Sequence, residues 1–169
     1  LLLQQIPLPL DGSECIGVTY EDVHADPDGA LDTIVARFRA IESRCDTVVI
    51  VGSDYTDVSS PTELGYNARI AANLGAPMLL VLNGRNPDRR PATPATGLTW
   101  GARTPDEIRQ MVDLMLTELH HEHATLLGVI VNRAEPEAMP AIVASISAMF
   151  PDPKPIVSAI PEDRILVAP

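Results

Sequence analysis

Four short runs of β-branched and other apolar residues constrain this chain more than any other feature of its sequence. Each run is continuous rather than alternating, at residues 47–51, 78–82, 126–131 and 156–157. Continuous runs of this length are typical of strands that are buried on both faces, as in parallel sheets. We therefore expect four buried parallel strands.

Helix signals alternate with these runs. A side-chain cap followed by proline and then by an acidic first turn occurs at Asp26-Pro27, Ser60-Pro61 and Thr104-Pro105. The cap accepts a hydrogen bond from an otherwise unpaired N–H group, and proline has no N–H to leave unpaired at that position. We predict helices over residues 29–44, 62–74, 105–121 and 137–150.

This order predicts an α/β domain with a parallel sheet and helices on both faces. A length of 169 residues suits a single domain, placed over residues 1–169. Ligands of such sheets bind beyond the carboxyl ends of the strands. The predicted binding loops are therefore residues 52–59, 83–103, 132–136 and 159–164.

Both ends of the sequence indicate a domain cut from a larger enzyme. The chain begins with Leu1 rather than Met, and it stops at Pro169 in the middle of a segment. We expect truncation at both ends and no complete catalytic centre within these residues.

The charge of the chain excludes several classes of partner. The net charge is −11 and Lys154 is the only lysine, whereas proteins that bind nucleic acid neutralise phosphates with basic side chains. No apolar run approaches the roughly 20 residues that span a bilayer. We expect a soluble, cytoplasmic protein without a nucleic-acid or membrane partner. Cys15 and Cys45 are expected to be reduced thiols, and a disulfide or redox pair is the alternative.

One loop after a predicted strand carries a candidate ligand site. Asp54, Thr56 and Asp57 offer carboxylate and hydroxyl oxygens that suit Mg²⁺ or a small polar ligand. The alternative is that these side chains cap local N–H groups. The sequence has no GxxxxGK[ST] phosphate loop, no GxGxxG and no GxSxG. We assign no catalytic residue and no metal.

Two further segments each allow two interpretations. The segment from His120 to His123 resembles a metal cluster, but histidines in a last helical turn also complement the helix dipole, which is the interpretation we favour. The loop 83–103, with Trp100, is a surface insertion or, alternatively, a lid or partner contact.

The sequence also resembles a known family. The segments that carry the likeness are VVIVG at 48–52, SPTELGYNARIAANLGAP at 60–77, GVIVNR at 128–133 and PIVSAIP at 155–161. In this order and spacing they resemble the N-terminal part of long-form phosphate acetyltransferases, which is itself similar to dethiobiotin synthetase. The likeness covers nearly the whole chain and looks closest to the actinobacterial branch.

The resemblance implies a P-loop-like fold whose phosphate-binding strand would precede Leu1. It implies a regulatory and assembly domain that responds to small metabolites and supports a homo-oligomer. Coenzyme A and acetyl-CoA would bind to the transferase domain, outside this chain, and no cofactor is expected within it. One departure from the dethiobiotin synthetase pattern is Val51, which stands where an acid is expected.

Two site residues follow from the same resemblance. Asn132 matches an asparagine that reads the nucleotide base in dethiobiotin synthetase, and the alternative is a strand-end asparagine that bonds the next turn. The neighbouring Arg133 meets either a phosphate or a surface carboxylate. Other readings of the whole chain are a fragment of an ATP-dependent ligase or a stand-alone binding module.

Overall fold

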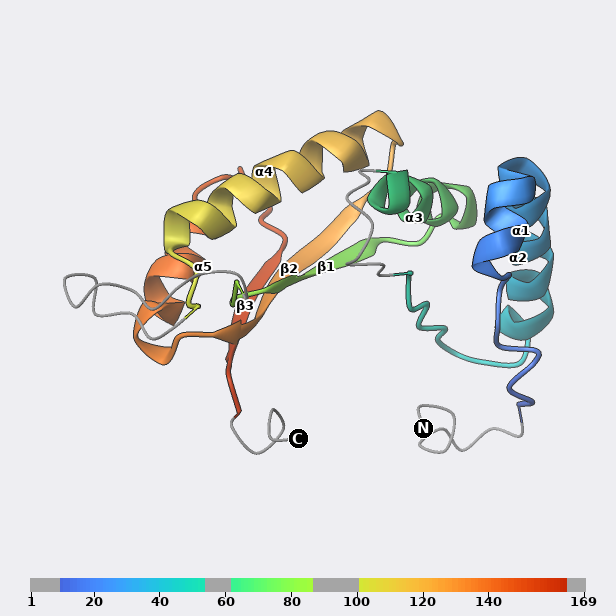
Figure 1. The fold of residues 1–169 in the computed structure, drawn as a ribbon, viewed down its shortest axis with the longest axis horizontal. Coiled ribbons are helices and arrows are strands. Elements are labelled where there is room, and N and C mark those ends of the chain that lie inside the picture. Colours follow the sequence, from blue (N-terminus) through green and yellow to red (C-terminus); the bar gives the residue numbers. More distant parts are fainter. Residues whose placement is uncertain (1–9, 54–61, 87–100, 164–169) are drawn as a thin grey trace.

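A computed structural model describes residues 10–53, 62–86 and 101–163 of the chain (Figure 1). In chain order its elements are α1 (Tyr20–Ala25), α2 (Pro27–Glu42), α3 (Thr62–Leu74), β1 (Met78–Asn83), α4 (Pro105–His121), β2 (Leu126–Ala134), the 3-10 turn η3 (Pro136–Ala138), α5 (Met139–Ser147) and β3 (Ile156–Pro161). No helix in these ranges is long and apolar enough to cross a bilayer.

The three strands form one parallel sheet in the order β1-β2-β3. Val81 of β1 is the register partner of Ile130 in β2, which in turn is the partner of Ser158 in β3. Parallel neighbours require crossover connections, and α4 and α5 provide them. The α/β class predicted from the sequence is confirmed.

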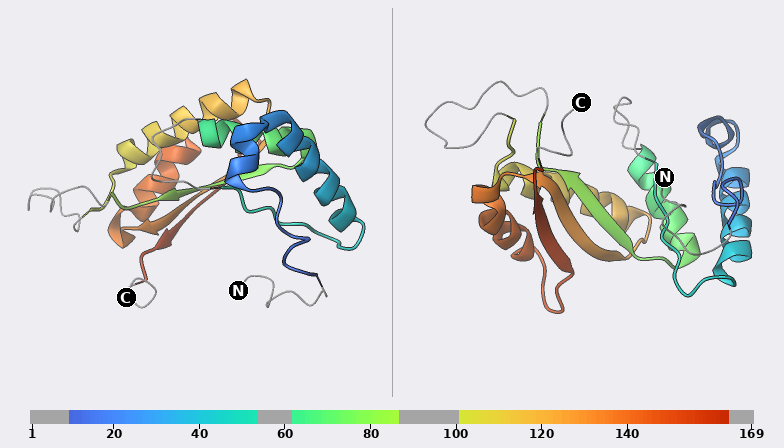
Figure 2. Two further views of the ribbon diagram at one scale, coloured as in Figure 1. Left: turned by 45° about the vertical axis from the view of Figure 1, so that its right-hand side comes forward. Right: turned by 90° about the horizontal axis from the view of Figure 1, so that it is seen from below.

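The core lies between the sheet and the helices α3, α4 and α5, which cover one face of it (Figure 2). Its completely buried large side chains come from both layers, namely Leu82, Ile108, Val112, Leu119, Val129, Val131, Ile142 and Ile146. Side chains alternate between the two faces of a strand, so Leu79 and Val81 lie on the other face. They are 42% and 59% exposed, because none of the described helices covers that face. Of the helical layers predicted on both faces, the described residues supply the layer on one face.

The helix starts follow the predicted capping chemistry. The Thr104 hydroxyl accepts from Glu107 N–H at 3.2 Å, and the Glu107 carboxylate accepts from Thr104 N–H at 2.7 Å, which completes a capping box. Asp26 caps α2 through Gly29 N–H at 3.1 Å. Helices α3 and α4 have the predicted bounds, whereas α2 begins two residues earlier and α5 is shorter than expected.

Helix α1 was not expected from the sequence. Thr19 and Asp22 form a capping box at its start, with Asp22 N–H donating to the Thr19 hydroxyl at 3.2 Å. The helix has six residues and buries none of them, so it has no apolar periodicity that a sequence pattern could reveal.

The predicted strand at residues 47–51 is wrong for this structure. These residues belong to no strand, and Val49 and Val51 are 85% and 74% exposed. A strand is stabilised by the ladder and the cross-strand packing that its neighbours provide. The run has strand composition, but no described strand lies beside it to complete a ladder.

Candidate functional site

The carboxyl ends of β1 and β2 place two asparagines side by side. Asn83 is the last residue of β1, and its register partner Asn132 lies near the end of β2. The side-chain oxygen of Asn83 accepts from Arg85 N–H at 3.0 Å, and that of Asn132 accepts from Arg133 N–H, also at 3.0 Å. Each asparagine thus accepts a hydrogen bond from a backbone N–H that follows it closely in the chain.

Two arginines and two glutamates form an ion-pair network at this edge of the sheet. Arg85 donates from Nη1 to Glu135 at 3.0 Å and from Nη2 to Glu162 Oε2 at 2.9 Å. Arg133 reaches the other oxygen of Glu162 from Nη2 at 2.7 Å and from Nε at 3.1 Å. Glu162 therefore bridges the two arginines, and the network joins the segments that follow β1, β2 and β3.

The Arg85 and Glu135 side chains of this network are largely buried. The side chains of Arg85 and Glu135 are 11% and 7% exposed, and those of Glu162 and Arg133 are 22% and 39% exposed. Two positive and two negative charges balance one another, and the low local dielectric strengthens their attraction. The arrangement holds three loops together and leaves no surplus positive charge among these four groups.

Backbone geometry explains why the two arginines approach each other. Arg133 has φ of 57°, in the left-handed region, so β2 turns sharply at its end. At Gly84, a Cβ atom would lie 2.8 Å from the Ala134 Cα and 2.9 Å from the Arg133 oxygen. Only glycine permits so close a crossing of the segments after β1 and β2.

A short antiparallel pairing lies at the base of the long loop after β1. Arg85 and Ala102 form an isolated bridge, and Asn86 N–H donates to Gly101 O at 2.7 Å. Arg103 N–H donates to Gly84 O at 2.9 Å. The residues on either side of 87–100 therefore meet beside the ion-pair network. Trp100 lies outside the described residues.

The predicted site residues divide into two groups. Asn132 and Arg133 stand at the carboxyl edge, where the guanidinium of Arg133 is held by a carboxylate. Asp54, Thr56 and Asp57 lie outside the described residues, so their ligand binding stays a prediction, as does that of Asn132 and Arg133. Sequence reasoning missed Arg85, Glu135 and Glu162, because no spacing pattern links residues 50 and 27 positions apart.

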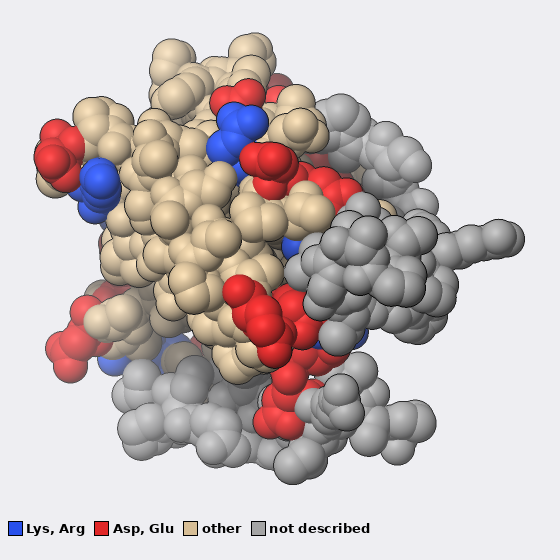
Figure 3. Space-filling model, turned by 90° about the vertical axis from the view of Figure 1, so that its left-hand side faces the viewer, with Lys and Arg blue, Asp and Glu red and all other residues tan. Residues whose placement is uncertain are grey.

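Charged side chains gather on this end of the molecule. Figure 3 faces the end at which the strands terminate and shows groups of acidic side chains there, while most of the rest of this face that the structure describes is neither acidic nor basic. This distribution agrees with the net charge of −11. An acidic field of this kind disfavours the approach of anionic ligands.

The histidine segment at the end of α4 contains one cluster of side chains that could ligate a metal. Among the described residues, Glu118, His121 and Glu122 have ligand atoms within 4.8 Å of one another. His121 Nδ1 lies 3.0 Å from Glu122 Oε1, and its side chain is 77% exposed. The exposure agrees with the solvated helix end that we favoured from the sequence.

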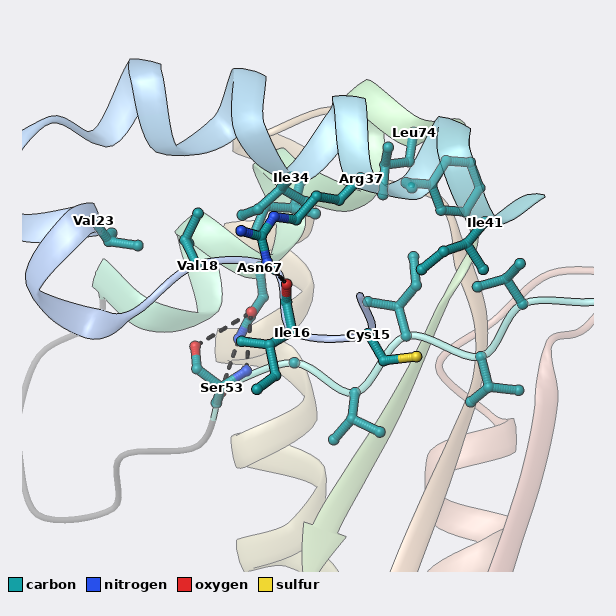
Figure 4. A pocket seen from close by; sticks show the side chains of 18 of the residues that line it. Cys15, Ile16, Val18, Val23, Ile34, Arg37, Ile41, Ser53, Asn67 and Leu74 are labelled. Carbon is teal, nitrogen blue, oxygen red and sulfur yellow. Dashed lines mark hydrogen bonds between the residues drawn. The ribbon is translucent and has the colours of Figure 1, made fainter. Parts of the chain in front are cut away.

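A second region, between α1, α2, α3 and residues 45–53, contains an open apolar pocket of about 1120 Å³ (Figure 4). The guanidinium of Arg37 bonds the carbonyl oxygens of Ser13 and Ile16 at its rim. The amide of Asn67 joins α3 to Ser53, donating to Ser53 O at 2.9 Å and accepting from Ser53 N–H at 3.3 Å. The side chains of Arg37 and Asn67 thus both bond protein backbone.

Two thiols and a phenol also line this pocket. Cys15 and Cys45 are free cysteines, as expected for reduced thiols. Tyr66 donates its hydroxyl to Pro27 O at 3.1 Å and so connects α3 to α2. Burial raises the pKa of the Tyr66 phenol above its ordinary value, Arg69 opposes this effect, and the nearby Asp28 adds to it.

Comparisons with known proteins agree with these observations. A family described as an AAA domain matches residues 17–169. The phosphate acetyltransferase of Synechocystis sp. is 29% identical over 171 residues, which cover 98% of this chain and 22% of that protein. The phosphate acetyltransferase of Nitratidesulfovibrio vulgaris is 36% identical over 69 residues, or 41% of this chain and 10% of that protein. No solved structure matches the chain.

The chain therefore aligns with 22% or less of the length of these relatives. The matches confirm the predicted resemblance to phosphate acetyltransferases and the P-loop-like α/β class. Because the family match extends over residues 17–169, most of its length, the chain belongs to the AAA domain family.

Proposed function

We propose that this chain is a regulatory and assembly domain of a phosphate acetyltransferase, the enzyme that interconverts acetyl-CoA and phosphate with acetyl phosphate and coenzyme A. The observation that carries the proposal is the alignment of 98% of the chain with 22% of a phosphate acetyltransferase. A region of that size beside a much longer remainder suits an accessory domain. Coenzyme A would bind in the remainder of the polypeptide.

The charge arrangement at the carboxyl edge supports a role outside catalysis. In α/β sheets this edge is the usual binding position. Here Arg85 and Arg133 are engaged by Glu135 and Glu162. Neither guanidinium is therefore available for the phosphate or coenzyme A substrates without breaking an ion pair. A domain that binds a small effector through Asn132, Asp54, Thr56 and Asp57 would be a regulatory domain rather than a transferase centre.

The proposal extends to partners and location. The domain would contact the transferase domain of its own polypeptide and contribute to a homo-oligomer in the cytoplasm. The sheet face that carries Leu79 and Val81 is one apolar surface on which such contacts can form. Association through this face would bury side chains that are now in water.

The test begins with the open reading frame on both sides of residues 1–169. We expect a long downstream frame that encodes a transferase domain. Deleting residues 1–169 from the purified full-length enzyme should leave acetyl transfer measurable while changing its response to metabolites or its oligomeric mass. The proposal fails if both the effector response and the oligomeric mass are unchanged by the deletion.

A second candidate is part of an ATP-dependent ligase of the dethiobiotin synthetase class, which the match to an AAA domain favours. It requires a GxxxxGK[ST] loop upstream of Leu1, since that loop holds the nucleotide phosphates. It also requires a stop codon soon after Pro169. Finding both would replace the first proposal.

A further inference from the structure

The carboxyl end of α4 brings together three side chains of the types that ligate metal ions. Glu118, His121 and Glu122 are spaced i, i+3 and i+4, so they share one face of the helix. One ligand atom of each lies within 4.8 Å of the other two, and His121 Nδ1 lies 3.0 Å from Glu122 Oε1. Around a tetrahedral ion the ligand atoms lie about 3.3 Å apart, since each bond to the metal is about 2.0–2.1 Å long. Small side-chain movements therefore suffice to bring all three groups onto one ion.

The helix itself does not explain the charges at this end. The carboxyl end of a helix carries partial negative charge and is stabilised by cations. Glu118 and Glu122 place two carboxylates there, one turn apart, where like charges repel. Pairing of the histidines with the helix dipole, which the sequence favours, leaves both glutamates unexplained. A bound cation would offset the charge of both.

The Glu118 carboxylate is half-buried against α3. A Cβ atom at Gly65 of α3 would lie 2.4 Å from Glu118 Oε1, so the glycine leaves the space that this carboxylate occupies (Figure 1). In the part of the chain that the structure describes, the Glu118 carboxylate makes no hydrogen bond or ion pair. A half-buried carboxylate is unfavourable unless a cation or a proton balances its charge. The position of Glu118 thus points to a missing positive partner.

Glu122 is also sheltered, and its contact is with an imidazole. Its side chain is 25% exposed, whereas that of His121 is 77% exposed. The guanidinium of Arg69 is within electrostatic reach of Glu122 but is bonded to Asp28 of α2. The cluster therefore has two sheltered carboxylates on the side of the protein and an imidazole on the side of the solvent.

We propose that Glu118, His121 and Glu122 form a binding site for a divalent transition-metal ion, with Zn²⁺ as the best fit. One imidazole nitrogen and two carboxylate oxygens are a donor set that suits Zn²⁺, whereas Mg²⁺ prefers oxygen ligands alone. Three protein ligands leave one position for water. The ion enters from the exposed side of His121 and neutralises the two carboxylates.

This site is separate from the candidate site described above. Glu122 precedes the first residue of β2, Leu126, by four positions, whereas Asn132 and the ion-pair network lie near the other end of that strand. The metal site therefore lies at the amino edge of the sheet. It does not depend on the proposed regulatory function.

Amide hydrogen exchange of the full-length polypeptide, with and without Zn²⁺, tests the site. At a Zn²⁺ concentration about ten times the dissociation constant, residues 118–124 should exchange about 10-fold more slowly, because the ion binds only the folded helix end. His121→Ala and Glu118→Gln should each abolish this slowing. The matched control is His120→Ala, an exposed histidine outside the cluster, which should keep it.

Equilibrium dialysis gives a second readout on the same proteins. His121→Ala should bind one equivalent of Zn²⁺ fewer than the wild type and His120→Ala, and zinc bound elsewhere in the polypeptide cancels in this difference. Exchange that Zn²⁺ leaves unchanged in the wild type overturns the proposal, as does slowing that persists in His121→Ala or Glu118→Gln. An equal loss in His120→Ala overturns it too, since surface histidines would then bind the ion without the cluster. Neither readout involves acetyl transfer, so the deletion experiment still judges the regulatory function.

Discussion

Residues 62–163 and residues 10–53 have similar apolar content but differ in how they bury it. All twelve buried members of the core cluster lie between Ala68 and Ile146. In residues 10–53 only Ala30 and Leu31 are buried, although the segment contains two helices and an apolar run. The first region packs helices on a sheet, whereas the second packs helices around an open pocket.

The difference teaches that apolar composition alone does not produce a core. A helix or strand buries its apolar face only against a second layer, and residues 62–163 supply both layers themselves. The amino-terminal region has a helical layer, but its strand-like run has no sheet beside it. Few contacts join the two regions, among them the Arg69–Asp28 pair and the Tyr66 hydrogen bond to Pro27.

The largest expected effect is that of breaking the ion-pair network. Arg85→Met should destabilise the protein by about 3–5 kcal/mol, because it removes the guanidinium that pairs with the sheltered Glu135 carboxylate. The matched control is Arg69→Met, whose pair with Asp28 is exposed and contributes at most about 1 kcal/mol. Urea unfolding of both variants measures the difference. Equal losses would show that burial does not distinguish the two pairs.

Core truncation sharpens the comparison between the two regions. Ile146→Ala removes a completely buried side chain from residues 62–163 and should cost about 2–5 kcal/mol. Ile16→Ala, at a side chain that is 58% exposed, should cost less than about 0.5 kcal/mol. Thermal and urea unfolding measure the loss of stability in both variants. A loss at Ile16 as large as that at Ile146 would contradict the account of the amino-terminal region.

Adding one methyl group probes packing tightness in the same two regions. A Cβ at Gly128 would lie 2.5 Å from the Ile156 oxygen, so Gly128→Ala should separate β2 from β3 and cost about 1–3 kcal/mol. At Gly52 the nearest atoms, at 3.0 Å, belong to the flexible Asn67 amide, which can move. Gly52→Ala should therefore cost less than about 1 kcal/mol. A larger loss of stability for Gly52→Ala than for Gly128→Ala in urea unfolding would contradict this difference in packing.

The smallest expected effect concerns the phenol between α2 and α3. The pKa of Tyr66 is raised in the folded protein, mainly by burial. Below the ordinary pKa of 10.0 the phenol is neutral in both states, so its contribution to stability is constant there. As pH rises through the folded pKa, the unfolded state is favoured and that contribution is lost. Tyr66→Phe should remove this part of the pH dependence.

The difference in phenolate absorbance between the wild type and Tyr66→Phe gives the titration directly. A transition above the ordinary value supports burial of the Tyr66 phenol, and a transition at or below it contradicts the described contact with Pro27. The stability curves of the two proteins should coincide at neutral pH once the small loss of one hydrogen bond is subtracted.

The sequence predicted the elements whose signals are local. The caps at Asp26 and Thr104 are short-range chemistry, and the runs at β1, β2 and β3 have the composition of strands. The run at 47–51 has the same composition and was mispredicted, because a strand also needs a neighbour, which composition does not specify.

The candidate site was less accessible from the sequence. Asn132 and Arg133 were named through a family resemblance, and the structure places both at the carboxyl edge of the sheet. Arg85, Glu135 and Glu162 meet only because two crossover connections bring three strand ends together. No spacing rule encodes that convergence, so only the fold reveals the network.

The central claim is that residues 62–163 form a packed unit while residues 10–53 lack the layer that would complete their core. Amide hydrogen exchange of the isolated chain, resolved by residue, tests it most directly. We predict slow exchange for the amides of β2 and the centre of α4, and fast exchange throughout residues 45–53 and α1. Protection of residues 45–53 equal to that of β2 would contradict the claim.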